Sequence, residues 1–441
     1  MNTNVTKLPA IELNNRRTIN GWAFFDWANS AFALVITVAI FPTYFTEVTA
    51  AEVKFLGFEM SNNALYAYSI SAAYILIAIL SPILSGIADY GGKKMVFMRF
   101  FTIIGSLACI SLFWFRDTSQ VYIGVLGFVL GMVGFAGGQV FYNSYLPQIA
   151  SEDQYDRVSA RGFTFGYVGS VILLIVNLLM IQKPEWFGIH NTGTTAVRIS
   201  FIMVGLWWIG FAIIPFSRLP RDKKNKNKGL ITRGFRELVK VWKFIQQQRQ
   251  IKIFLAAFFC YNAGVQTVLY LASLFAKQEL HFETSELIIV VLILQIVAIG
   301  GAYIFAKLSD AKGNKFSIMV MLVIWIVICF LAYIVSGKLD FYALAAGVGI
   351  VMGGIQSLSR STYAKLLPED LKDTASFFSF YEVVDKISII LGTFSFGLIT
   401  NITGNMRMSV LVLGVYFLLG LVILRYVKIE HATGLVEEVE V

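Results

Sequence analysis

A single carboxylate stands in the first long apolar segment of the chain, residues 21–46. Asp26 shares one helical stripe with Trp22 and Asn29, because residues three or four apart lie on the same side of a helix. Ionised groups are costly in hydrocarbon and usually face a cavity or a partner. We therefore expect Asp26 and Asn29 to bind a proton or a cation. The alternative is that Asp26, only about 9 Å inside the membrane, reaches the surface or bonds to a neighbouring backbone.

Two later apolar segments carry further buried charges. Arg360 falls in the segment 340–366, and the segment 375–401 contains Glu382, Asp385 and Lys386. Glu382 precedes Lys386 by four residues, the favourable order for a helical ion pair, which leaves Asp385 for Arg360. This cluster is either a neutral structural network or a set of pairs that break and re-form as helices move. In a third alternative, one carboxyl group binds a proton because burial disfavours its charge.

Uncharged amides mark where a small polar solute would bind. Gln139 and Asn143 are four residues apart and share one face of a helix, and so do Asn262 and Gln266. We expect these amides to line a site together with the charged cluster. The alternative for each of them is a hydrogen bond that joins neighbouring helices. The candidates are Gln139, Asn143, Asn262, Gln266, Gln295 and Gln356.

The elements that position these residues are membrane-spanning helices. Of the 441 residues, 57% are hydrophobic and only 14% are charged, which is typical of a polytopic membrane protein. Apolar runs of about 20 residues, long enough to cross a bilayer as helices, recur along the chain. The strands of a membrane barrel would show short alternating segments instead. We predict an all-α fold with twelve spans, near 21–46, 64–88, 95–115, 120–149, 159–182, 198–216, 253–277, 286–308, 316–336, 340–366, 375–401 and 408–427.

Sequence motifs of several enzyme classes are missing. The chain has no G-x-x-x-x-G-K-[ST] phosphate loop, no H-E-x-x-H metal motif and no G-x-S-x-G nucleophile motif. The three histidines lie outside the predicted spans, and the three cysteines fall on separate ones. We therefore expect no catalytic residue, no metal and no cofactor, and we do not expect an enzyme.

Residues 217–252 concentrate the positive charge of the chain. They hold twelve Lys and Arg residues against Asp222 and Glu237, a net charge of +10, whereas the whole chain carries +9. A single loop thus accounts for the basic character, and a nucleic-acid partner loses its support. Basic loops mark the cytoplasmic side, so we expect both termini to be cytoplasmic and the protein to reside in the cell membrane. Apolar residues recur at helical spacing between Leu230 and Gln250, which predicts a helix at the lipid interface or, alternatively, a solvated spacer.

The loop divides the chain into two halves with related sequences. We expect an N-terminal six-helix bundle at 1–216, the basic linker at 217–252, and a C-terminal bundle with a short cytoplasmic tail at 253–441. The second span is followed by Asp89-Tyr90-Gly91-Gly92-Lys93-Lys94, and the eighth by Asp310-Ala311-Lys312-Gly313-Asn314-Lys315. Both segments carry D-x-x-G followed by basic residues. Each could also be an ordinary tight turn between helices.

These repeated segments resemble the signature of the major facilitator superfamily, and Gly21–Phe32 (GWAFFDWANSAF) resembles its branch of autophagy-type vacuolar amino-acid effluxers. The resemblance implies two six-helix bundles that rock about a central site and expose it to each side in turn. It also implies that Asp89 with Lys93, and Asp310 with Lys315, form a cytoplasmic gate. Ser85 and Ala306 stand where the signature has glycine, so the resemblance does not extend to the helix packing at these two positions.

Together these features predict a secondary active transporter. We expect a small polar solute, such as an amino acid or a related metabolite, to be moved by alternating access, with protons as the driving ion and efflux as the direction. We expect a monomer whose other partners are membrane lipids. The alternative is a non-transporting receptor or scaffold with the same fold, but a scaffold has no need to bury Asp26 or Asp385.

Overall fold

The computed structural model describes residues 12–429, apart from 191–192, 221–229 and 369–372. Within these residues, twelve helical segments are long and apolar enough to cross a membrane, which confirms the predicted all-α polytopic fold. Residues 1–11, the hydrophilic part of the linker at 221–229 and the C-terminal tail from 430 lie outside the described residues.

The first six spans begin with a composite segment, Arg16–Val48, which consists of α1 (Arg16–Ala31), the π-helix η1 (Phe32–Ile40) and α2 (Phe41–Val48). The other five are built on α3 (Asn62–Gly91), α4 (Lys94–Ser111), α5 (Val121–Ser144), α7 (Tyr155–Gln182) and α8 (Thr195–Arg218). The short helix α6 (Leu146–Ile149) follows α5. Short 3-10 turns lie at Leu112–Trp114, Thr118–Gln120, Glu152–Gln154 and Pro184–Phe187.

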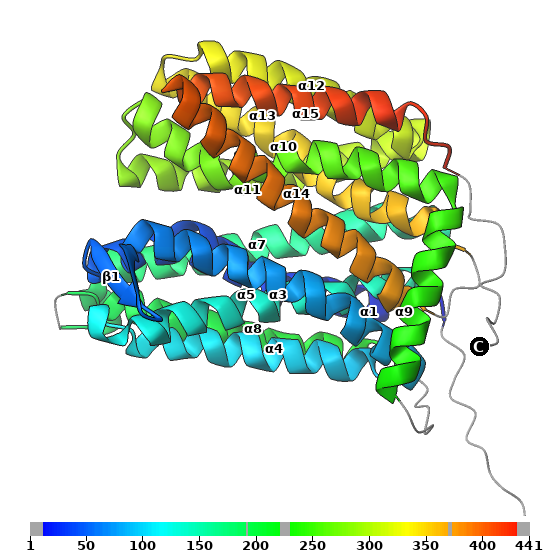
Figure 1. Ribbon diagram of the computed structural model, residues 1–441, viewed down its shortest axis with the longest axis horizontal. Helices are drawn as coiled ribbons and strands as arrows, with labels where there is room; N and C mark the ends of the chain where they lie inside the picture. Colours follow the sequence, from blue (N-terminus) through cyan, green and yellow to red (C-terminus); the bar gives the residue numbers. More distant parts are fainter. Residues whose placement is uncertain (1–11, 191–192, 221–229, 369–372, 430–441) are drawn as a thin grey trace, which may run out of the picture.

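The last six spans follow the linker helix α9 (Leu230–Gln247). They are built on α10 (Arg249–Glu279), α11 (Thr284–Lys312), α12 (Asn314–Ile334), α13 (Lys338–Lys365), α14 (Thr374–Thr403) and α15 (Met406–Leu424). Figure 1 shows α10 to α15 gathered on one side of the molecule and α1 to α8 on the other. We call α1 to α8 the N-half and α10 to α15 the C-half.

A two-stranded hairpin, which the hydropathy pattern did not predict, lies at one end of the spans. Strand β1 (Glu52–Phe55) pairs antiparallel with β2 (Phe58–Ser61). Leu56 and Gly57 connect the strands with φ angles of 51° and 89°, and such left-handed pairs suit a two-residue hairpin turn. We call this the hairpin end. Figure 1 shows α9 crossing the opposite end of the spans, the α9 end.

Close helix packing in both halves depends on glycine. A Cβ atom added to Gly134 of α5 would lie 2.5 Å from the Cα of Gly105 on α4. In the C-half, a Cβ atom on Gly353 of α13 would lie 2.1 Å from the carbonyl oxygen of Ala298 on α11. Any larger residue would push these helices apart, so the small residues set the positions from which α5 and α13 present their polar side chains.

Candidate functional site: a charged cavity between the halves

A cavity of about 260 Å³ lies between the two halves. Spans from both halves line it, and its lining includes the aromatic residues Tyr74, Phe258, Tyr261 and Tyr381. It contains nearly all the residues that the sequence suggested for binding or coupling. These are Asp26, Gln139, Asn143, Asn262, Gln266, Gln295, Gln356, Arg360, Glu382, Asp385 and Lys386.

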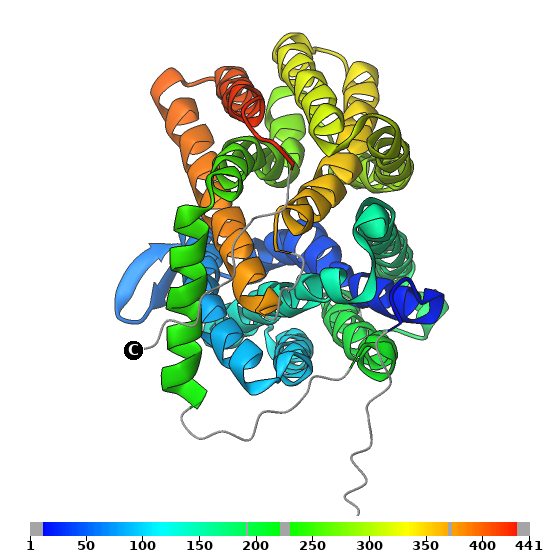
Figure 2. The ribbon, with the colours of Figure 1, turned by 90° about the vertical axis from the view of Figure 1, so that its right-hand side faces the viewer.

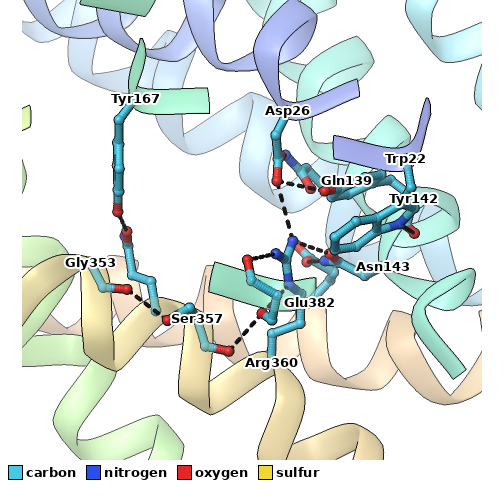
Figure 3. A network of polar contacts seen from close by, with 12 residues as sticks. Trp22, Asp26, Gln139, Tyr142, Asn143, Tyr167, Gly353, Ser357, Arg360 and Glu382 are labelled. Carbon is cyan, nitrogen blue, oxygen red and sulfur yellow. Dashed lines mark hydrogen bonds and ion pairs between the residues drawn. The ribbon is translucent and has the colours of Figure 1, made fainter. Parts of the chain in front are cut away.

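Arg360 of α13 reaches across the interface into the N-half (Figure 3). Its guanidinium donates hydrogen bonds to the Asn143 side chain (3.1 Å) and to the hydroxyl (2.9 Å) and carbonyl (2.8 Å) oxygens of Ser159. The guanidinium carbon also lies 4.7 Å from the ring centroid of Trp22 and 4.4 Å from that of Phe163. Arg360 is thus held in place by planar hydrogen bonding and by aromatic faces, which a lysine could not reproduce.

Asp26 is the anionic partner of Arg360, at 3.4 Å. Its carboxylate also accepts hydrogen bonds from the Tyr142 hydroxyl (2.6 Å) and from the Gln139 amide (3.3 Å). The expected pairing of Arg360 with Asp385 is therefore wrong. The reason is geometric: Arg360 points into the N-half, where it meets Asp26 of α1.

Lys386 neutralises part of a second cluster on α14. Its ammonium lies 3.2 Å from Glu382 and 2.5 Å from Asp385, so the expected pairing of Glu382 with Lys386 is present and Asp385 shares the same cation. The Asp385 carboxylate also accepts hydrogen bonds from Asn262 (2.8 Å) and Gln266 (3.3 Å) of α10. Three carboxyl groups thus face two cations in the cavity, which leaves a net charge of −1 when all are ionised.

Asn143 joins the two charged clusters. Its amide oxygen accepts from Arg360, and its amide nitrogen donates to Glu382 at 2.9 Å. A continuous polar chain therefore runs from α1 through α13 and α5 to α14. On the other side of the cavity, the Tyr167 hydroxyl of α7 donates to Gln356 of α13 at 2.6 Å. Gln295 lines the cavity from α11.

Asn29 departs from the expected site. It is completely buried in the N-half and is not among the residues that line the cavity. Neither of its side-chain polar atoms has a hydrogen-bond partner among the described residues. Asn29 does follow Asp26 by three residues on α1. At its position, however, α1 is packed against other helices, so Asn29 does not reach the cavity.

The α9 end is closed by polar contacts between the halves. Asp89, at the end of α3, accepts hydrogen bonds from the backbone N–H groups of Ala375 (3.2 Å) and Ser376 (2.7 Å) at the start of α14. A carboxylate at a helix N-terminus is favoured by the helix dipole. Asp89 pairs with Lys94 (3.1 Å), not with Lys93, because Lys94 is the buried one of the two.

The second repeated turn also contacts the opposite half. Asp310 pairs with Arg157 of α7 at 2.9 Å, and the Arg157 side chain is largely exposed. Lys315, the other gate candidate of this turn, donates to the Arg425 carbonyl oxygen inside the C-half. In this turn it is therefore Asp310, through Arg157, that contacts the N-half.

A buried carboxylate near this turn was not identified from the sequence. Asp156 of α7 accepts from Ser309 (2.8 Å), Asn314 (2.7 Å) and Lys365 (2.7 Å), which lie on three helices of the C-half. The only sign of it in the sequence was the position of this carboxylate just before the fifth apolar run. Its three partners are far away in sequence, and nothing in the local pattern points to them.

The hydrogen bonds and ion pairs between the halves that are given above lie toward the α9 end. Among them, Tyr167 with Gln356 lies farthest from that end. The cavity extends beyond it, past Leu34, Leu269 and Ile389, toward the hairpin end. The cavity is therefore closed at the α9 end, where Asp26 and Arg360 form its charged floor.

Known proteins are similar to this chain over nearly its whole length. The family described as "Vacuole effluxer Atg22 like" matches residues 14–434. The uncharacterized MFS-type transporter YxiO of Bacillus subtilis is 32% identical over 422 residues, covering 95% of this chain and 96% of the relative. Autophagy-related protein 22 of Kluyveromyces lactis is 28% identical over 414 residues, covering 85% of this chain and 81% of the relative.

Solved structures show the same fold. The major facilitator superfamily transporter FucP, in the outward conformation, superposes with a TM-score of 0.70. That comparison covers 94% of this chain and 99% of the FucP chain at 13% sequence identity. At this identity the likeness concerns the fold alone.

Proposed function

Because the chain belongs to the vacuole effluxer Atg22 like family of major facilitator superfamily transporters, we propose that it carries a small polar solute through the central cavity by alternating access. The membership confirms the resemblance seen in the sequence. The observation that carries the proposal is the charged cavity between two halves whose polar contacts gather at one end. A receptor or scaffold would need neither the cavity nor the Asp26–Arg360 pair across it.

The lining favours a zwitterionic solute such as an amino acid. Arg360 and Lys386 offer positive charge for a carboxylate, and Glu382 and Asp385 offer negative charge for an ammonium group. The volume of about 260 Å³ lies below the range of about 300–1,000 Å³ typical of pockets for drug-sized ligands, which suits a small metabolite. The effluxer description of the family supports export as the direction of transport.

Protons are the proposed driving ion. The net charge of −1 in the cavity leaves room for one added positive charge. Protonation of Asp26 would remove the anionic partner of Arg360, and Arg360 would then be free to bind a solute carboxylate or to separate from α1. Binding and helix movement would thereby be linked through a single pair. Each chain holds a complete cavity, which supports a monomeric unit.

The α9 end is proposed to face the cytoplasm, with both termini on that side and the protein in the cell membrane. The start of α1, the end of α15 and the linker helix α9 all lie at this end. The concentration of Lys and Arg in the linker supports the orientation.

Transport by the purified protein tests the proposal. A thermal-shift screen against amino acids, sugars, nucleosides and carboxylates should find stabilisation by a zwitterionic amino acid. Proteoliposomes with an imposed pH gradient should then accumulate that solute, and a sodium gradient alone should not drive it. If no solute class stabilises the protein and none is transported, a scaffold role is favoured instead. Accumulation driven by sodium alone would refute proton coupling.

A further inference from the structure

Helix α9 links the two halves at the closed end. On the N-half, a Cβ atom at Gly86 of α3 would lie 2.3 Å from the carbonyl oxygen of Gly234, so the two backbones are in direct contact. On the C-half, the Trp242 and Phe380 ring centroids are 5.3 Å apart, and Phe244 packs edge-on against Phe377 of α14. A single helix therefore holds both α3 and α14.

The outward side of α9 carries two exposed stripes, one apolar and one basic, although the Trp242 ring also packs against Phe380 of α14. Phe235 and Trp242 are 55% and 48% exposed, and they lie seven residues apart on one stripe of the helix. Arg236 and Lys243, also seven residues apart and exposed, form the adjacent stripe. An apolar stripe beside a basic one is typical of helices that lie in a membrane surface.

The position of α9 matches that arrangement. It crosses the spans at the level where they end, and Figure 2 shows it along the outer edge of the molecule beside α3 and α14. Its exposed face is therefore directed outward, where lipid surrounds the spans. Arg233 contacts Tyr90 and Lys240 pairs with Glu237, whereas Arg236 and Lys243 form no ion pair within the described residues.

We propose that α9 binds anionic phospholipid headgroups through Arg236 and Lys243, with Phe235 and Trp242 at the hydrocarbon boundary, and that this binding stabilises the closed α9 end. The occupant is an anionic lipid because the unpaired side chains are cationic and the flanking ones are apolar; phosphatidylglycerol is the probe that we choose. A soluble phosphate compound would leave the apolar stripe uncovered. The inference does not depend on which solute is transported.

Lipid contact is measured with a fluorescent label at Gln246→Cys, which lies on the same stripe as Trp242. The three native cysteines are replaced by alanine, and the full-length protein is placed in vesicles that contain brominated phosphatidylglycerol or brominated phosphatidylcholine. We expect quenching to favour the anionic lipid by about 25-fold, because Arg236 and Lys243 each contribute about fivefold near an anionic surface. The Arg236→Gln/Lys243→Gln variant should lose this preference.

The matched control is Lys307→Gln/Lys312→Gln, which removes two exposed cations of α11 toward the same end. It should keep the preference. Equal quenching by both lipids in the unmodified protein, or an equal loss in the control, would overturn lipid binding by α9.

The link to the closed end is measured separately with spin labels at Phe58 and Leu339, which are exposed at the hairpin end of the two halves. Adding phosphatidylglycerol to phosphatidylcholine nanodiscs should increase the population with a long distance between these labels, which corresponds to a closed α9 end. The Arg236→Gln/Lys243→Gln variant should not respond. A lipid preference without any change in the distance distribution would overturn the stabilising role.

Discussion

Arg360 of the C-half lies 3.4 Å from Asp26 of the N-half, so one ion pair joins the two halves at the floor of the cavity. Both side chains are almost fully buried, which makes the pair costly to break without a replacement. A proton on Asp26 or a carboxylate brought by the solute can supply that replacement. The pair therefore connects the charge state of the site to the separation of the halves.

Asn143 is expected to be essential because it bonds to Arg360 and Glu382 at once. Asn143→Leu keeps the approximate volume but leaves two buried charged groups each short of a partner. We expect it to lower the free energy of unfolding by about 1–3 kcal/mol and to reduce transport strongly. Thermal melting and proteoliposome uptake measure the two effects.

Asn29→Leu is the matched control, because Asn29 is equally buried but has no described hydrogen-bond partner. We expect little change in melting temperature or in uptake. If Asn29→Leu impairs transport as much as Asn143→Leu does, the site must be enlarged to include the interior of the N-half.

Asp156 and Lys365 are expected to act as a second lock at the α9 end. Asp156→Leu leaves the Lys365 ammonium largely buried without its anion, a loss of about 3–5 kcal/mol when a buried pair is broken. The closed end should lose stability, and spin labels at Phe58 and Leu339 should report more protein with a short distance. In Asp156→Leu/Lys365→Met, which removes both charges, most of the closed population should return. An unchanged distribution in the single variant would contradict this role.

Asp373, just before α14, gives the closed end a pH dependence. Burial, the nearby Asp89 carboxylate and a hydrogen bond with Glu237 together raise the pKa of Asp373 from 3.8 to about 8, whereas Lys240 opposes them. On opening, we expect solvent to return this pKa toward 3.8. Protonated Asp373 thus favours closure: its contribution is complete below pH 3.8, falls as the pH rises, and is lost above about 8.

Raising the pH past about 8 should therefore increase the fraction of protein open at the α9 end. Asp373→Asn stays neutral, so its open fraction should vary less with pH over this interval. Accessibility of a cysteine at Lys93 to a soluble maleimide is the readout. The same pH response in Asp373→Asn would assign it to another group.

Orientation in the membrane can be tested with two exposed positions at opposite ends. Lys312 lies at the α9 end, and Trp186 follows α7 at the hairpin end. In intact cells, a cysteine at Trp186 should react with an impermeant maleimide and one at Lys312 should react only after lysis. The reverse pattern would place the α9 end outside the cell.

Much of the fold followed from hydropathy, because each span is a long apolar run whose helix needs no partner to be recognised. The cavity residues could also be predicted from the sequence, since a charge or an amide within such a run must face protein. The partners of the charged residues could not be predicted in this way. Asp26 and Arg360 are separated by more than three hundred residues, and only the crossing of α1 and α13 decides that they meet.

The hairpin and the Asp156 cluster were missed for a similar reason. Strands β1 and β2 have four residues each, too short for a periodic signal, and Asp156 gains its partners only when the halves come together. Lys94 and Lys93 are adjacent in the signature, and only the start of α4 decides which of them points into the interface.

The most direct measurement compares solute exchange with accumulation in Asp26→Asn, with Asp340→Asn, an exposed aspartate of α13, as the control. The neutral amide mimics protonated Asp26, so the variant should still exchange labelled solute across proteoliposome membranes but should not concentrate it when a pH gradient is imposed. Asp340→Asn should do both, as the unmodified protein does. Accumulation by Asp26→Asn to the unmodified level would contradict a coupling role for the Asp26–Arg360 pair.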